Sequence, residues 1–213
     1  MRISTAYNNM AKRYQELNED KLGVYYIYNI FGSKLVAEYP GIAEFIVYSR
    51  ALLPNEFLNR LSAHFDFDES EDFPKRRRFG GFDPVFDYQK ALSPENIKEF
   101  RKILSDFFGK KPRWQTYKGF EEIRSFWNFS DAEMSALLYC TTATILERFT
   151  NILNKFSVKS RQRIIMAALK LKPEDFHGLF GINSALRKKG IIDENYACND
   201  DIIDFLSNGA KGY

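Results

Sequence analysis

The amino-acid sequence predicts a mainly α-helical protein with a winged-helix-like C-terminal half, meaning a helix-turn-helix followed by a small wing. Two segments, residues 93–108 and 130–155, combine a helix-start signal with an amphipathic run. Several short helical segments then follow between residues 160 and 206, separated by glycine, proline and asparagine. Only 12 Gly and 7 Pro occur in 213 residues, which argues against a turn-dense all-β chain.

The clearest break in the chain is the segment 66–87, in which an acidic run is followed by a basic run. Its turn-forming residues are typical of an exposed loop: Pro74, Gly80, Gly81 and Pro84. We therefore expect two regions. Residues 1–120 form an aromatic-rich region that is helical or mixed, and residues 121–213 form the winged-helix-like module.

In the first region, two segments leave the choice between helix and strand open. Residues 23–31 and 42–53 are rich in aromatic and β-branched side chains, and periodicity does not separate a buried strand from a buried helix. Residues 5–21 are polar and compatible with a helix, and residues 56–65 carry the apolar face of an amphipathic helix. The many tyrosines and phenylalanines of this region fit an interface or a core, and we prefer the core.

The helix predicted at residues 93–108 has a recognisable start, apolar stripe and end. Ser93 is the expected N-cap, Pro94 fits the first helical position, and Glu95 lies where the helix dipole favours negative charge. Gly109 is expected to end the helix. One apolar stripe faces the core: Ile97, Phe100, Ile103, Leu104 and Phe107.

The second region begins with a capping box, in which Ser130 and Glu133 satisfy each other's backbone amides. We expect this helix to continue to about Lys155. Further helices are predicted at residues 160–171, 173–180, 184–189 and 200–206, with an extended segment and a small strand pair at 190–198.

The composition excludes several kinds of site. With 2 Cys and 2 His, the chain has neither a disulfide framework nor a four-ligand zinc site of Cys and His, unless carboxylates or a second chain contribute. His64 and His177 stand in no spacing typical of a catalytic triad, and Cys140 lies in an apolar run typical of a core thiol. We therefore expect no enzymatic activity, no metal and no cofactor in this chain.

The sequence also predicts the compartment. No segment approaches the ~18 consecutive apolar residues of a membrane span, and the first residues lack the apolar core of a signal peptide. Two cysteines are compatible with a reducing environment, so we expect a cytoplasmic protein without membrane contact. The net charge of +3 is too small to indicate a polyanionic partner by itself.

Four motifs in the second region occur in a suggestive order: FSDAE (129–133), AALKLKPED (167–175), NSALRKKGII (183–192) and DIIDFL (201–206). Their spacing resembles the helical, winged-helix-like region N-terminal to the core of AAA-type ATPases, over residues 120–207. The resemblance implies a non-catalytic accessory domain that contacts substrate, an adaptor, another subunit or its own ATPase core. No G-x-x-x-x-G-K-[ST] motif is present, so the resemblance also implies that the chain stops before the ATPase core.

Two basic clusters support an alternative, a stand-alone winged-helix protein that binds nucleic acid. Basic residues interleaved with aromatics and glycine can bind single strands by charge and stacking, and basic residues beside a helix-turn-helix can contact phosphates. The candidates are Arg76, Arg77 and Arg78 in the loop, and Arg161, Arg163, Arg187, Lys188 and Lys189 around the helix-turn-helix. Two observations favour the protein-interaction hypothesis. The loop's basic run can pair with the acidic run before it, and Arg187, Lys188 and Lys189 suit the C-terminal end of a structural helix.

Overall fold

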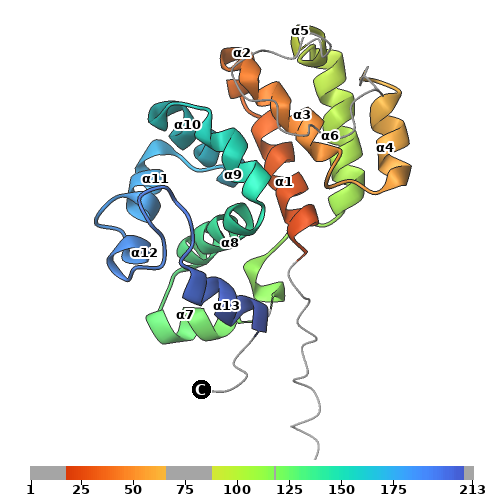
Figure 1. Cartoon of the computed structure of the whole chain (residues 1–213). Helices are drawn as coiled ribbons and strands as arrows, with labels where there is room; N and C mark the ends of the chain where they lie inside the picture. Colours follow the sequence, from red (N-terminus) through yellow and green to blue (C-terminus); the bar gives the residue numbers. More distant parts are fainter. Residues whose placement is uncertain (1–17, 66–87, 118, 209–213) are drawn as a thin grey trace, which may run out of the picture.

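The computed structural model describes residues 18–65, 88–117 and 119–208 (Figure 1). In these residues the chain is helical and forms no β-strand. The predicted loop 66–87, with Arg76, Arg77 and Arg78, lies outside the described residues, as does most of the segment 5–21. Among the described helices, none combines the length and the apolar character needed to cross a bilayer.

Where the first region is described, it consists of helices joined by turns. Its elements are α1 (Glu19–Phe31), α2 (Leu35–Glu38), the 3-10 helix η1 (Pro40–Ala43), α3 (Glu44–Ser49), α4 (Asn55–Ser62), α5 (Tyr88–Ala91), α6 (Pro94–Phe108) and the 3-10 helix η2 (Trp114–Thr116). Of the two segments left open by the sequence, residues 23–31 lie in α1, and residues 42–49 lie in η1 and α3 and are followed by a turn at 50–53. Helix α6 begins at the predicted N-cap Ser93, whose hydroxyl accepts from the Asn96 amide, and ends at Gly109.

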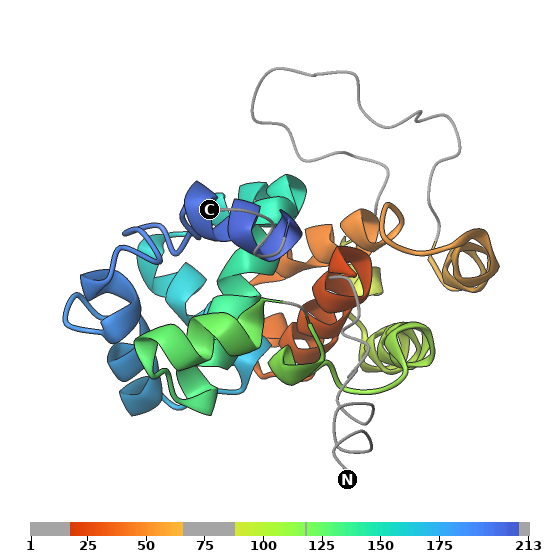
Figure 2. The same ribbon diagram turned by 90° about the horizontal axis from the view of Figure 1, so that it is seen from below.

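Helix α1 is the central element of the fold. It packs against α6 on one side and against α8 and α10 of the second region on the other, as the view from below also shows (Figure 2). Every residue from Leu22 to Phe31 except Tyr28 is buried. A helix enclosed on all sides carries apolar residues without a 3.6-residue period, which is why periodicity could not distinguish it from a strand.

Aromatic and polar contacts join α1 to both neighbours. The Phe31 ring lies 4.8 Å from that of Phe100 on α6, and the Tyr26 ring lies 4.9 Å from that of Tyr139 on α8. The buried Asn29 side-chain amide donates a 2.8 Å hydrogen bond to the Ala168 carbonyl of α10. The aromatic-rich segment therefore forms core.

The second region consists of α7 (Phe120–Trp127), α8 (Asp131–Ile145), α9 (Glu147–Asn154), α10 (Val158–Leu169), α11 (Pro173–Phe180), α12 (Ala185–Lys188) and α13 (Asp200–Asn208). The capping box at Ser130 is present. The prediction of one helix from 130 to about 155 was wrong, because the chain leaves the helical conformation at Leu146.

Hydrogen bonds from threonine hydroxyls to backbone carbonyls account for the break at Leu146. The hydroxyls of Thr142 and Thr144 donate to the carbonyls four residues earlier, a pattern that bends helices. Thr150 on α9 donates to the Ala143 carbonyl at the end of α8. The break lets α9 fold against α3, where Lys155 forms an ion pair with Glu44.

Residues 190–199 form a tight turn in place of the expected strand pair. Ile192 and Cys198 make an isolated antiparallel bridge. Within the turn, one carboxylate oxygen of Asp193 accepts hydrogen bonds of 2.8 Å from the backbone amides of Asn195 and Ala197. The turn is thus fixed by its own side chain without a strand ladder.

Candidate interaction surface

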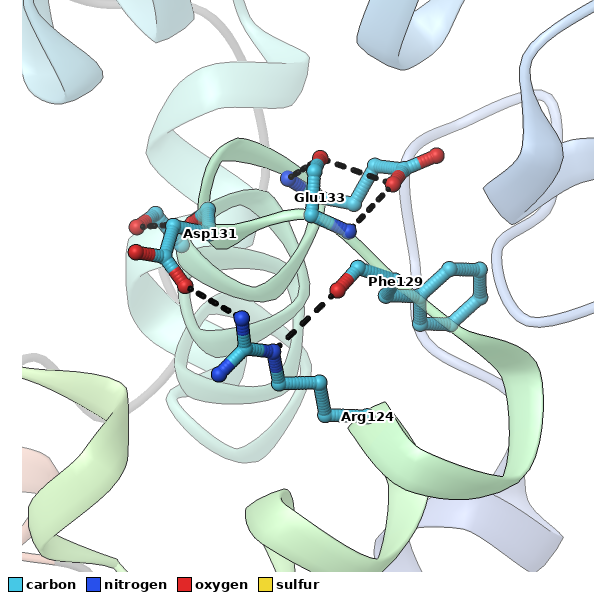
Figure 3. Close-up of polar contacts among 6 residues, drawn as sticks. Arg124, Phe129, Asp131 and Glu133 are labelled. Carbon is cyan, nitrogen blue, oxygen red and sulfur yellow. Dashed lines mark hydrogen bonds and ion pairs between the residues drawn. The ribbon is translucent and has the colours of Figure 1, made fainter.

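Polar contacts at the start of α8 cap that helix and join it to α7 (Figure 3). The Glu133 carboxylate accepts from the Ser130 amide at 2.7 Å, and the Ser130 hydroxyl accepts from the Glu133 amide at 3.3 Å. From α7, Arg124 donates to the Phe129 carbonyl at 3.3 Å and lies 3.4 Å from the Asp131 carboxylate. Asn128 adopts a left-handed conformation and makes the sharp turn between the two helices.

An exposed aromatic pair lies at the end of α7. The Phe126 side chain is 79% exposed and meets the half-buried Trp127 ring edge to face, at 5.0 Å between centroids. Trp127 in turn stacks on Phe129 at 5.9 Å. The Lys189 ammonium, just after α12, lies 5.9 Å from the centre of the Phe129 ring, within cation–π range.

These contacts bring the C-terminal ends of α7 and α12 to one surface. We call it the α7–α12 surface and define it by its four accessible side chains: Phe126, Trp127, Lys188 and Lys189. Phe126 is not among the residues predicted from the sequence. A signal was available, because Phe120, Ile123 and Trp127 form the inward stripe of α7 and Phe126 falls outside it.

Arg187 does not share this surface, because it turns back onto its own module. Its guanidinium donates to the Glu194 carbonyl at 3.2 Å and lies 5.4 Å from the centre of the Tyr196 ring. Arg187 thereby fastens α12 to the 190–199 turn. Lys188 and Lys189 remain exposed.

Arg163 is also occupied within the fold. Its guanidinium donates to the Tyr39 hydroxyl at 2.9 Å and lies 2.6 Å from the Glu38 carboxylate, so it links α10 to the first region. The hydrogen bond to Tyr39 raises the pKa of Arg163. A hydrogen bond from Ser160, and then that from Arg163, lower the pKa of Tyr39.

Arg161 lines a cavity of about 470 Å³ between α8, α9, α10 and the 190–199 turn. The fold therefore separates the basic residues predicted to act together. Arg161 lines a cavity, and Arg163 and Arg187 make contacts within the fold. Of these five residues, Lys188 and Lys189 alone are exposed side by side.

His64 follows α4 and His177 lies on α11, whereas Cys140 and Cys198 are near enough to each other to interact. His64 is exposed and lies 3.9 Å from Glu99, and His177 is exposed on α11. Cys140 and Cys198 are buried free thiols, and burial raises the pKa of both, that of Cys198 to about 11. In the part of the chain that the structure describes, no group of three or more His, Cys, Asp or Glu side chains could hold a metal ion.

Comparison of the chain with protein-family models, with curated proteins and with solved structures finds no match.

Proposed function

We propose that this protein is a non-catalytic helical interaction module that binds a protein partner through the α7–α12 surface. The observation that carries the proposal is the exposed Phe126, which packs edge to face on Trp127. Trp127 stacks on Phe129, the Lys189 ammonium lies over the Phe129 ring, and Lys188 is exposed next to Lys189 in the chain. A large aromatic side chain that is held in place loses little further entropy on binding, and aromatic residues dominate binding energy in protein interfaces. The two lysines favour a partner segment with apolar and acidic side chains.

Electrostatic arithmetic favours a protein partner over duplex DNA. Two exposed lysines can neutralise two phosphates, which gives a slope of log K against log salt of about −1.8. Proteins that depend on phosphate contacts for affinity make roughly 6–10 such contacts. Helix α12 has only four residues and is about 6 Å long, too short to present several side chains along a major groove.

The resemblance to the region preceding AAA-type ATPase cores supports the same role. It implies that the partner is an ATPase core, a substrate, an adaptor or another subunit. The helix-turn-helix of α11 and α12, followed by the fixed 190–199 turn, fits a winged-helix-like module. Modules of this type serve as protein-interaction domains as well as DNA-binding domains.

Site-specific photocrosslinking tests the proposal. We would place p-benzoylphenylalanine at position 126 of the full chain and irradiate it in cells of the source organism. Position 158 provides a matched control, because Val158 is another exposed apolar side chain, 64% exposed on α10. We expect one discrete protein adduct from position 126, lost on Lys188→Glu and Lys189→Glu, and no such adduct from position 158.

Two outcomes would overturn the proposal. If positions 126 and 158 capture the same proteins in the same yield, the α7–α12 surface does not select a partner. A nuclease-sensitive adduct from position 126 would instead support the second candidate, a single-strand nucleic-acid binder. The specific observation behind that candidate is the aromatic pair beside two lysines, which could stack bases and contact phosphates.

A further inference from the structure

A second feature lies apart from the α7–α12 surface, in a pocket of the second region that is partly open to solvent. The cavity of about 470 Å³ falls in the size range of small-molecule sites. Apolar side chains from α8, α9 and α10 supply part of its wall: Ala143, Leu153 and Ile165. Polar side chains supply the rest, and two of them have unused hydrogen-bonding capacity.

The first of these is Tyr139 on α8. Its side chain is 1% exposed, its ring packs against Tyr26 and Phe149, and its hydroxyl has no hydrogen-bond partner among the described residues. Leaving a buried hydroxyl unpaired costs about 1–3 kcal/mol. Burial raises the pKa of Tyr139 well above its usual value, so the hydroxyl is a neutral donor.

The second is Arg161 on α10, which lines the same cavity. Its Nε atom is buried without a partner, and none of the described carboxylates forms an ion pair with its guanidinium. The acidic residue lining the cavity is Asp193, one of whose carboxylate oxygens is engaged by two amides of its own turn. Arg161 thus lines the cavity without an ion pair to a described carboxylate, while the hydrogen-bonded Asp193 keeps its own negative charge.

The walls around these two groups are held in place. The Thr144 hydroxyl on α8 accepts from the Cys198 amide at 2.8 Å, and the Gln162 side-chain amide on α10 donates to the Tyr196 hydroxyl at 3.1 Å. Both bonds tie the 190–199 turn over the cavity. Donors that are held in position before a ligand arrives lose little entropy on binding.

We infer that this cavity is a binding site for a small organic anion, whose carboxylate or phosphate accepts hydrogen bonds from Arg161 and Tyr139 while its apolar part contacts Leu153 and Ile165. The inference goes beyond the proposed protein interaction and does not depend on it. The chemistry it requires is one anionic group on a compact apolar body. Asn154 and Asn195, whose amides can both donate and accept, complete the polar part of the lining.

Titrations followed by NMR test the inference. The ¹⁵N-labelled full chain would be titrated with phenyl phosphate, with benzoate and, as a neutral counterpart, with benzyl alcohol. We expect saturable shifts at the amides of 139–144 and 193–198 with at least one of the anions, and none with benzyl alcohol. The two anions distinguish a phosphate site from a carboxylate site.

Two variants separate the site from general charge effects. We expect Arg161→Gln to weaken binding of the preferred anion at least tenfold. Lys159→Gln removes the same charge from an exposed position on the same helix and should leave the affinity unchanged. Equal affinity in Arg161→Gln, equal binding of benzyl alcohol, or no saturable shift with either anion would overturn the inference.

Tyr139→Phe adds a test that does not depend on losing stability. If the hydroxyl serves a ligand, removing it should weaken anion binding severalfold and leave the free protein as stable as the wild type, or more stable, because a buried unpaired group is lost. A destabilised Tyr139→Phe variant with unchanged anion affinity would assign the hydroxyl a structural role and contradict the inference.

Discussion

The Arg163 guanidinium donates a 2.9 Å hydrogen bond to the Tyr39 hydroxyl, joining residues 124 positions apart in the chain. The same guanidinium lies 5.5 Å from the centre of the Tyr39 ring. This contact fastens α10 of the second region to the segment after α2 in the first. Arg163, which the sequence suggests as a phosphate contact, is therefore part of the interface between the first and the second region.

Replacing Arg163 by alanine should lower stability and leave nucleic-acid binding unchanged. Both Arg163 and Glu38 are partly exposed, so solvent and salt screen the ion pair. We therefore expect a small decrease in the free energy of unfolding, which becomes smaller still with added salt. Urea unfolding at low and high salt measures it. Lys159→Ala, an exposed change on the same helix, is the control. A loss of unfolding free energy that is unchanged at high salt would mean that Arg163 stabilises the protein by packing and not by its charge.

Replacing Ser130 by alanine should destabilise the protein by about 1 kcal/mol, because α8 loses the hydroxyl that caps its first turn. The control is Ser135→Ala on the exposed side of α8. Its hydroxyl bonds back to the Asp131 carbonyl, so its loss should be close to neutral. Chemical denaturation compares the two variants. Equal costs would show that the capping box adds nothing beyond loss of a serine.

Replacing Asn29 by alanine should cost about 1–3 kcal/mol, because the Ala168 carbonyl loses its donor in a buried position. Asn59→Ala on the exposed side of α4 is the control and should change stability little. The free energy of unfolding measures both. A near-neutral Asn29→Ala would mean that water replaces the side-chain amide at the seam between α1 and α10.

The buried thiol of Cys198 should make the protein sensitive to alkali. Burial raises its pKa from 9.0 to about 11, so the folded state holds its proton more tightly than the unfolded state. The resulting stability is complete below pH 9 and is lost as pH rises through 11, amounting to at most about 3 kcal/mol for this group.

Urea unfolding between pH 8 and 11 measures this loss, and Cys198→Ala should show a shallower decline than the wild type. At pH 8 the native protein should also react slowly with a thiol reagent and the unfolded protein quickly, because the thiolate is the reactive form. Rapid labelling of the native protein would contradict the burial of both cysteines.

Local signals in the sequence were sufficient for several helix ends. Ser93 and Ser130 were predicted to begin helices and do so, because an N-cap depends on atoms within four residues of one another. The end of α6 at Gly109 was predicted for the same reason. The break at Leu146 was missed, since its cause is a set of threonine hydrogen bonds that an apolar stripe does not reveal.

The surroundings of the candidate site residues could not be predicted from local sequence patterns, because they depend on residues distant in the chain. Arg161, Arg163 and Arg187 carry the same charge, yet their surroundings differ. Arg161 lines a cavity, Arg163 donates to the hydroxyl of residue 39, and Arg187 donates to the carbonyl of residue 194. Phe126 became conspicuous only once the core around α7 was formed.

The sequence by itself thus determined the helical class and the capped helix starts, because these rest on contacts within one or two turns. The tertiary structure alone decided that α1 is a central helix, which basic residues remain free, and where a cavity is left. Those properties depend on how segments more than a hundred residues apart pack together, as Asn29 and Ala168 do across 139 positions.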